Sequence, residues 1–370
     1  MHLKAGKSGK SLVGDARGTA KTIGDEASRM GIKLDEIMKN ANKRAKEEIL
    51  TQGLNEFSYK RIPFTSPRMN YCTFGGIPIG KITEFYGEEH GGKTTTALDI
   101  VANYQKSDDD RDVLYIDAEN TLDVEWAEKI GVDVDKIYIL QPKSQSAEEI
   151  FQIICDAVDT GEVGLWVIDS IGALMSSQEL EKTLEDKTYG GIAKPLTLFG
   201  KKVEMLMQRH KCTGIGINQI RENLASTYGG ITTPGGKAWK HFCAVRMEFR
   251  RGEFLDEKGN KLTRSAESPV GNVVMMSMTK NKTCPPTRRT GFYTINYTIG
   301  IDYLRDLIEV AIKYDIIQKS GAWFDIVDKE TGEVLEGKLH GQSNVTEFLK
   351  EHEDVLNRVE SLVEKEMQEN

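Results

Sequence analysis

Short apolar runs alternate with segments of helical periodicity between about residues 60 and 300. The runs predict buried strands at residues 81–86, 113–117, 137–141, 165–169 and 214–218. Apolar side chains spaced three or four apart predict helices between them, at residues 94–105, 123–130, 147–159 and 198–210. This alternation is typical of an α/β fold whose mostly parallel, twisted sheet is covered by helices on both faces. Ligands of such sheets bind beyond the carboxyl ends of the strands, so we expect the chemistry of this chain to lie there.

The N-terminal part of the chain breaks this pattern. Residues 1–33 are rich in Gly, Ser, Lys and Ala, which is typical of a mobile arm, and apolar spacing predicts a helix at residues 34–50. That helix packs either on its own core or on a neighbouring subunit. The core itself is expected to end with a polar loop at residues 252–271 and two further strands, at residues 272–278 and 291–297.

The last part of the chain predicts a small, mainly helical unit with some strand. Helices are expected at residues 303–314 and 345–367, with a strand near Trp323, and the acidic C-terminus is expected to be a solvated helix face. We therefore predict three parts, which are an arm with an oligomerisation helix (residues 1–58), a large α/β core (59–301) and a C-terminal α/β domain (302–370).

Composition and charge exclude several classes of protein. The 370 residues are 39% hydrophobic and 29% charged, as in soluble globular proteins. There is no 18-residue apolar run and no apolar leader after the basic N-terminus, so we expect neither a membrane span nor secretion. The five scattered cysteines favour reduced thiols in the cytoplasm. With a net charge of −8, any contact with nucleic acid must come from local basic patches.

The most specific motif is GEEHGGKT at residues 87–94, which matches the phosphate-binding pattern G-x-x-x-x-G-K-[ST] between a predicted strand and a predicted helix. Backbone N–H groups of such a loop and the following helix N-terminus bind phosphate oxygens. Lys93 would reach the β- and γ-phosphates and Thr94 would bind Mg²⁺. The expected nucleotide-binding residues of this segment are Gly87, Glu88, Glu89, His90, Gly91, Gly92, Lys93, Thr94 and Thr95.

Acidic residues at two later strand ends complete the predicted NTPase site. Asp169 ends the apolar run LWVID and would hold Mg²⁺ opposite Thr94. Glu119 lies two residues past the run VLYID, where a carboxylate can face the γ-phosphate and orient the attacking water. Asp117, the last residue of that run, competes for the same role.

Two long polar segments follow strand ends and are candidate DNA-binding loops. Gln219 follows the run GIGIN, where its amide would sense the γ-phosphate and control the loop at residues 221–236. A second loop, at residues 181–191, follows the strand that ends at Asp169. Nearby basic side chains are suited to tracking a phosphodiester backbone. They are Lys194, Lys201, Lys202, Lys237, Lys240, Arg250 and Arg251.

Eight motifs, taken in order over residues 60–350, resemble the RecA-type recombinases at nearly the spacing of that family. They are IGKITEFYGEEHGGKTT, VLYIDAENTLD, LWVIDSIGALM, GIGINQIREN, TPGGKAWKHF, RMEFRR, TKNKTCPP and GAWFDI. The resemblance implies a RecA-like P-loop core and a DNA-dependent ATPase with ATP and Mg²⁺ as ligands. It also implies a helical filament on single-stranded DNA that catalyses homologous pairing and strand exchange with double-stranded DNA during repair.

The resemblance also assigns roles to individual residues. Asp123 and Trp126 fall where the family contacts adenine, and an indole there can stack on the base. Lys280 and Lys282 match positions that reach the ATP of the adjacent subunit, so catalysis would occur between subunits. The expected catalytic residues are Lys93, Glu119, Gln219, Lys280 and Lys282. The expected DNA-binding residues are Tyr189, Gly190, Lys194, Lys201, Arg221, Leu224, Gly235, Gly236, Lys237, Arg250 and Arg251.

The chain departs from the family's pattern at three places, which suggests a divergent bacterial or phage-like member. The P-loop interior is Glu-Glu-His-Gly where the family usually has Pro-Glu-Ser-Ser, and residues 1–58 do not match the family's N-terminal helix. Met275 and Ser277 stand where basic residues often hold the second DNA strand. A second hypothesis is therefore a nucleotide-gated assembly or mediator protein without strand exchange. Loader proteins and single-strand-binding proteins are further candidate partners.

Overall fold

The chain divides into two compact units, residues 1–58 and 59–370. The computed structural model describes residues 36–37, 39–45, 59–183, 191–222, 231–257, 259–263 and 266–369. In the first unit residues 36–37 and 39–45 are helical, as predicted for residues 34–50, whereas the predicted mobile arm lies outside the described residues. All five cysteines are free thiols. No described helix is both long enough and apolar enough to cross a membrane.

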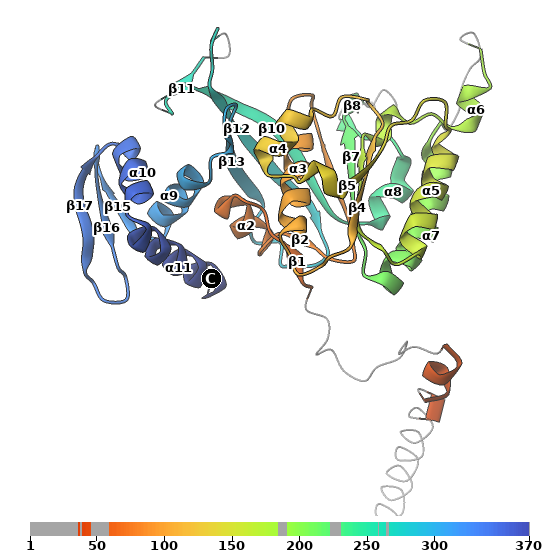
Figure 1. The fold of residues 1–370 in the computed structure, drawn as a ribbon, viewed down its shortest axis with the longest axis horizontal. Helices are drawn as coiled ribbons and strands as arrows, with labels where there is room; N and C mark the ends of the chain where they lie inside the picture. The colour runs from red at the N-terminus through yellow and green to blue at the C-terminus, as the bar shows by residue number, and fades with distance from the viewer. Residues whose placement is uncertain are drawn as a thin grey trace, which may run out of the picture. The chain divides into compact units, whose positions relative to one another are not determined.

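The second unit is built on one large, mostly parallel sheet, which confirms the predicted α/β class (Figure 1). The strand order is β14-β13-β12-β10-β3-β7-β6-β4-β5, with β11 added to β10. Neighbouring strands from β10 to β5 in this order pair in parallel. Strand β12 pairs antiparallel with β10 and with β13, and β13 pairs antiparallel with β14. Strands β3 and β6 are buried along their whole length, which explains their uninterrupted apolar runs. The strands are β3 Ile82–Gly87, β4 Asp112–Asp117, β5 Ile137–Leu140, β6 Val163–Asp169, β7 Thr213–Gln219, β10 Cys243–Leu255, β11 Lys261–Leu262, β12 Gly271–Asn281, β13 Thr290–Asn296 and β14 Gly300–Ile301.

Helices cover both faces of this sheet and form two separate cores. Apolar residues of α2, α3 and α4 pack on one face, and those of α5, α7 and α8 pack on the other (Figure 1). Serine and aspartate side chains set where several of these helices begin. Ser146 caps α5 in a capping box with Glu149, and Asp123 caps α4. The helices are α2 Pro67–Thr73, α3 Lys93–Gln105, α4 Val124–Ile130, α5 Ala147–Asp159, α6 Ser177–Leu180, α7 Ala193–His210 and α8 Gly236–Phe242.

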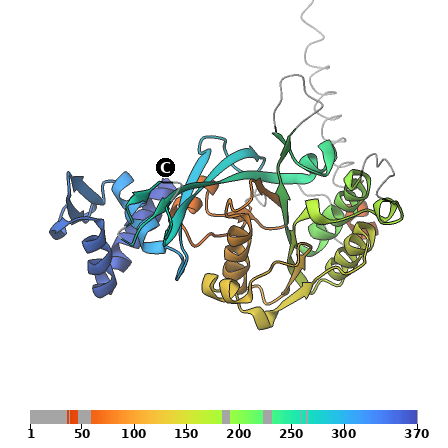
Figure 2. The ribbon, with the colours of Figure 1, turned by 90° about the horizontal axis from the view of Figure 1, so that it is seen from above.

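Two predicted boundaries in the core were wrong. Helix α7 begins at Ala193, five residues before the predicted start, because Pro195 is tolerated in a first turn and Leu196 is buried. The predicted loop at residues 252–271 is partly strand, since β10 continues to Leu255 and pairs with β11. This ribbon is largely exposed, so it carries polar residues without the apolar alternation that would have revealed it. Figure 2 shows β10 and β12 extending from the helical layers toward the C-terminal region.

The C-terminal region has its own apolar core, and it contains more strand than the sequence predicted. Three antiparallel strands stand where one was expected, because their exposed and half-buried side chains hide the apolar pattern. The predicted long helix is interrupted at His352, whose φ of −123° and ψ of 81° are not helical. The elements are α9 Tyr303–Lys313, β15 Ile317–Ser320, β16 Trp323–Val327, β17 Val334–His340, α10 Gln342–Glu351 and α11 Glu353–Glu369.

A fully buried carboxylate, Asp306, lies in the first turn of α9, where this region meets strand β13. It accepts a hydrogen bond from the Thr294 backbone N–H at 3.4 Å and one from the Thr294 hydroxyl at 3.3 Å. The Arg68 guanidinium is 3.9 Å away. Burial raises the pKa of Asp306 to about 7, although the hydrogen bonds and Arg68 act in the opposite direction.

Candidate functional site

The P-loop begins where strand β3 ends, and two of its glycines are required by close backbone approach. Gly87 has a φ of +153°, and a Cβ on it would lie 2.0 Å from the Phe249 carbonyl oxygen. Gly92 has a φ of +89° at the N-cap of α3, and a Cβ there would lie 2.8 Å from Val274 Cγ2. His90, between them, also has a positive φ of 55°. The backbone of the loop therefore packs closely against β10 and β12 and leads directly into the N-terminus of α3.

Lys93, the first residue of α3, is buried and folds back on the loop. Its ammonium donates hydrogen bonds to the carbonyl oxygens of Gly87 at 3.2 Å and Glu88 at 2.6 Å. Burial lowers the pKa of Lys93, and the nearby carboxylates of Asp169 and Glu119 partly offset this effect. A buried ammonium bonded only to neutral carbonyls is suited to receive an anionic ligand.

Thr94 and Asp169 bring two hard oxygen ligands together beside the P-loop. The Thr94 hydroxyl donates to Asp169 Oδ2 at 2.7 Å, and the buried Tyr115 hydroxyl donates to the same oxygen at 3.0 Å. Burial raises the pKa of Asp169, and the two hydroxyl donors act against that shift. A hydroxyl and a carboxylate in contact at the end of a P-loop fit a Mg²⁺ ion that also binds phosphate oxygens.

Glu119 and Gln219 meet at the carboxyl edge of the sheet, as their positions after β4 and β7 predicted. Gln219 Nε2 donates to Glu119 Oε1 at 3.0 Å. Asp117, the competing candidate, is 2% exposed and accepts hydrogen bonds from the backbone N–H groups of Thr121 and Leu122. Because Asp117 shapes the turn after β4, Glu119 is the carboxylate left to face a ligand.

These groups line one cavity of about 900 Å³, a size suited to a nucleotide. Trp126 lines the same cavity, and its indole N–H donates to Thr95 Oγ1 at 3.2 Å. The cavity also contains aromatic and polar residues that the sequence had not indicated as ligands. Tyr297 donates from its hydroxyl to Asn272 Oδ1 at 2.9 Å, next to Arg251. An aromatic residue directly after strand β13 was the available signal for Tyr297. The predicted residues that line the cavity are Glu89, His90, Gly91, Gly92, Lys93, Thr94, Thr95, Glu119, Asp123, Trp126, Asp169 and Gln219.

Comparison with known proteins decides the family. The family model for the RecA N-terminal domain matches residues 33–302, and the model for the RecA C-terminal domain matches residues 305–368. The chain belongs to the RecA family. It is therefore a DNA-dependent ATPase of the recombinase class, as the ordered motifs predicted.

Individual RecA proteins are similar to this chain over most of its length. Protein RecA of Clostridium acetobutylicum is 35% identical over 290 residues, which cover 78% of this chain and 77% of that protein. Protein RecA of Mesoplasma florum is 35% identical over 287 residues, or 77% of this chain and 80% of that protein. Protein RecA of Aquifex aeolicus is 33% identical over 346 residues, or 93% of this chain and 94% of that protein.

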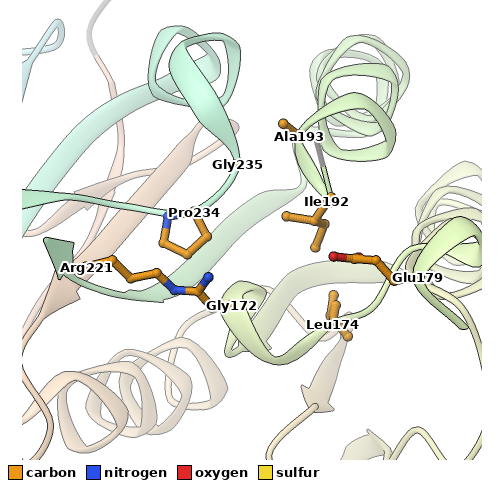
Figure 3. A pocket seen from close by; sticks show the side chains of 9 residues that line it. Gly172, Leu174, Glu179, Ile192, Ala193, Arg221, Pro234 and Gly235 are labelled. Carbon is orange, nitrogen blue, oxygen red and sulfur yellow. The ribbon is translucent and has the colours of Figure 1, made fainter. Parts of the chain in front are cut away.

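A second, smaller pocket in this RecA-family protein lies where the two predicted DNA loops begin and end. Figure 3 shows Arg221 and Glu179 extending toward it from opposite sides. Its volume is about 260 Å³, and Leu174, Ile192 and Pro234 also line it. Arg221 follows Gln219 by two residues, so one short segment of chain reaches both this pocket and the nucleotide cavity.

The other predicted DNA contacts divide into three groups. Tyr189, Gly190 and Leu224 lie outside the described residues. Lys194 and Lys201 are exposed on α7, and Lys237 is exposed on α8 directly after Gly235 and Gly236. Arg250 pairs with Glu248 at 2.6 Å, and Arg251 lines the nucleotide cavity instead of the pocket between the loops. The ends of the longer loop are joined, because Arg221–Glu222 (β8) pairs with Ile231–Thr232 (β9).

A buried network ties the end of this longer loop to the strand that leads into the P-loop. Glu84, in the middle of β3, is fully buried and pairs with the Arg246 guanidinium. Glu84 also accepts hydrogen bonds from Asn218 at 3.0 Å and from the Trp239 indole at 3.2 Å. Asn218 in turn donates to the Pro234 carbonyl oxygen at 3.0 Å. The residue before Gln219 and the end of the loop are thus fixed to the same carboxylate.

The ammonium groups of Lys280 and Lys282 lie at the C-terminal end of α8, away from the P-loop. Both ammonium groups donate to carbonyl oxygens at the end of α8, with Lys282 Nζ 3.2 Å from the His241 oxygen. This helix end leads into Cys243, which pairs with Ile82 at the start of β3. The five residues from there to Gly87 span about 16 Å of strand. The two lysines therefore cannot reach the phosphate loop of their own protomer.

Proposed function

We propose that this RecA-family protein hydrolyses ATP with Mg²⁺ while polymerised on single-stranded DNA, and pairs that strand with a homologous duplex. The observation that carries the proposal is the position of Gln219, which lines the nucleotide cavity, contacts Glu119 and directly precedes the segment that lines the pocket between the DNA loops. A residue in this position can form a hydrogen bond with the γ-phosphate and thereby change the conformation of a DNA-binding loop. The mediator hypothesis without strand exchange is not favoured, because both domains of the recombinase family match.

The residues around the cavity are suited to in-line hydrolysis of ATP. In this proposal Lys93 exchanges its carbonyl partners for oxygens of the β- and γ-phosphates. Glu119 accepts a proton from the attacking water as that oxygen bonds to the γ-phosphorus and the bond to the β–γ bridging oxygen breaks, which yields ADP and inorganic phosphate. Mg²⁺ held by Thr94 and Asp169 would neutralise charge on the phosphate oxygens. Asp123, Trp126 and Tyr297 would hold the adenosine end.

Lys280 and Lys282 act in this proposal on the nucleotide of a neighbouring protomer. Their ammonium groups at the end of α8, away from the P-loop of their own protomer, support this role, because a head-to-tail polymer brings different surfaces of adjacent protomers together. Two cations would then face the γ-phosphate from outside the protomer that binds it, as an arginine supplied in trans does in other NTPases. Hydrolysis would require the assembled filament.

DNA would be held by the loops and by the basic residues after them. Arg221 in the pocket and Lys194, Lys201 and Lys237 nearby are positioned to contact phosphates, while the loops contact bases. Met275 and Ser277 offer no charge to a second strand, so the affinity for duplex DNA would rest on other residues. In this proposal the protein acts on DNA in the cytoplasm, with loader and single-strand-binding proteins as candidate partners.

The test is ATP turnover measured with and without single-stranded DNA across a range of protein concentrations. The proposal expects DNA to stimulate turnover and the rate per protomer to rise with concentration until filaments are complete. Electron microscopy of the same samples with ATP and DNA should show helical filaments. Turnover that is independent of DNA, or closed rings at every concentration, would contradict it.

A further inference from the structure

The hydroxyl of Ser170 makes a contact that the proposed mechanism has not used. Ser170 follows Asp169, is 1% exposed and donates to Glu119 Oε1 at 2.5 Å. Gln219 Nε2 donates to the same oxygen at 3.0 Å. The water-orienting carboxylate is therefore held by two donors from the ends of two different strands, and within the described chain no hydrogen bond reaches its other oxygen, Oε2.

The Ser170 hydroxyl does not cap the helix that begins at this residue. Ser170 stands at the N-cap of a short 3-10 helix, Ile171–Ala173, where a serine side chain usually accepts from the backbone of its own helix. Its side chain makes no such bond. Ser146 and Ser66, at the N-caps of α5 and α2, do accept from their own helices. The Ser170 hydroxyl is directed instead to a residue 51 positions away along the chain.

We propose that Ser170 is a positioning residue for Glu119 and is the donor that remains when Gln219 turns to the γ-phosphate. This inference deepens the proposed function and rests on it. A glutamate side chain has three rotatable bonds, and a carboxylate released by its only other donor would lose its alignment with the attacking water. One fixed donor on Oε1 keeps the carboxylate in place and leaves Oε2 to accept the proton of that water.

The experiment compares Ser170→Ala with the wild-type protein in DNA-stimulated ATP turnover. Loss of the hydroxyl should lower kcat by about 10- to 100-fold, as expected for a misplaced general base. Affinity for a non-hydrolysable ATP analogue with Mg²⁺ should stay within about twofold, because Ser170 contacts neither phosphate nor metal in this proposal. Ser170→Thr keeps the hydroxyl and should restore most of kcat.

Ser146→Ala is the matched control. Ser146 is also a buried serine whose hydroxyl donates to a glutamate, Glu149, at 3.0 Å, but it caps α5 outside the nucleotide cavity. Its replacement should lower the melting temperature and leave kcat close to wild type. A general effect of removing a buried serine hydroxyl would instead appear in both variants.

A double variant separates this inference from the proposed function. If Ser170 acts through Glu119, then Ser170→Ala added to Glu119→Gln should lower kcat no further than Glu119→Gln alone. Full turnover by Ser170→Ala while Glu119→Gln is inactive would overturn only the role of Ser170. Loss of analogue affinity in Ser170→Ala would also overturn it, since the effect would then come through Asp169. Turnover retained by Glu119→Gln would overturn the catalytic assignment itself.

Discussion

Catalysis between protomers predicts that two inactive variants restore each other's activity. Lys93→Ala removes the phosphate-binding ammonium and leaves Lys280 and Lys282 intact. The double variant Lys280→Ala/Lys282→Ala removes these two lysines and leaves the P-loop intact. Each protein alone has one defective half in every interface, so each should show turnover near background. A mixed filament contains some interfaces in which both halves are intact.

The size of the recovery follows from the head-to-tail arrangement. With random assembly at equal amounts, half of the protomers carry an intact pocket and half carry intact lysines, so about one quarter of the interfaces are competent. Turnover in the mixture should therefore reach about one quarter of the wild-type rate per protomer. As the ratio of the two variants is changed, the rate should follow the product of their fractions and be greatest at equal amounts.

The assay is DNA-stimulated ATP turnover after the two variants are mixed without nucleotide and then given ATP and single-stranded DNA. A matched control, Lys136→Ala/Lys350→Ala, removes two exposed lysines elsewhere and should retain wild-type turnover. Mixtures that never exceed the sum of the separate variants would refute catalysis between protomers. Full activity of Lys280→Ala/Lys282→Ala alone would refute the role of those lysines.

Three further variants test other parts of the structure. Gln219→Ala should bind the ATP analogue normally but lose stimulation of turnover by DNA, and stimulation retained at the wild-type level would contradict its coupling role. Arg246→Met leaves the buried Glu84 carboxylate without its partner and should lower the free energy of unfolding by about 3–5 kcal/mol in urea, whereas Glu84→Gln/Arg246→Met should recover part of this loss. Burial raises the pKa of Asp306 to about 7, against about 3.9 in an unfolded chain, so the native state keeps a proton that the unfolded state loses. Between these values the free energy of unfolding should fall as pH rises, by on the order of 4 kcal/mol. Asp306→Asn should therefore raise the melting temperature at pH 8 much more than at pH 5, and an equal change at both would contradict the argument.

The core of the fold could be predicted because local and long-range preferences agree there. Buried strands such as β3 and β6 are continuous apolar runs, and the capping box of Ser146 and Glu149 marks the start of α5 in the sequence itself. Apart from the start of α7 and the break at His352, the errors lie in exposed ribbons, in β10–β11 and in the C-terminal sheet. There the strand is stabilised by pairing with a neighbour distant in sequence, and its side chains need not be apolar.

Only those residues of the candidate site that stand at a strand end or in a motif could be predicted from the sequence. Asp169 ends a predicted strand, Lys93, Thr94, Glu119 and Gln219 follow predicted strands, and the structure brings all five to one cavity. Sequence alone did not find Tyr297 or Ser170, because a single tyrosine or serine after a strand has no characteristic spacing. Their contacts with Asn272 and Glu119 join segments 25 and 51 residues apart, which only the folded sheet places together.

The arrangement of the sheet connects the proposed nucleotide site to the longer of the two predicted DNA loops and to Lys280 and Lys282. Gln219 and Asn218 are consecutive residues at the end of β7; one faces the nucleotide cavity and the other donates to Glu84 and Pro234. A rotation of this strand end that moves Gln219 toward a γ-phosphate would therefore act on the end of the DNA loop through Pro234. Helix α8 begins two residues after Pro234, and Lys280 and Lys282 contact its last carbonyls. In the proposed filament, a change at the loop would therefore reach, through one seven-residue helix, the two cations proposed to complete the next protomer's site.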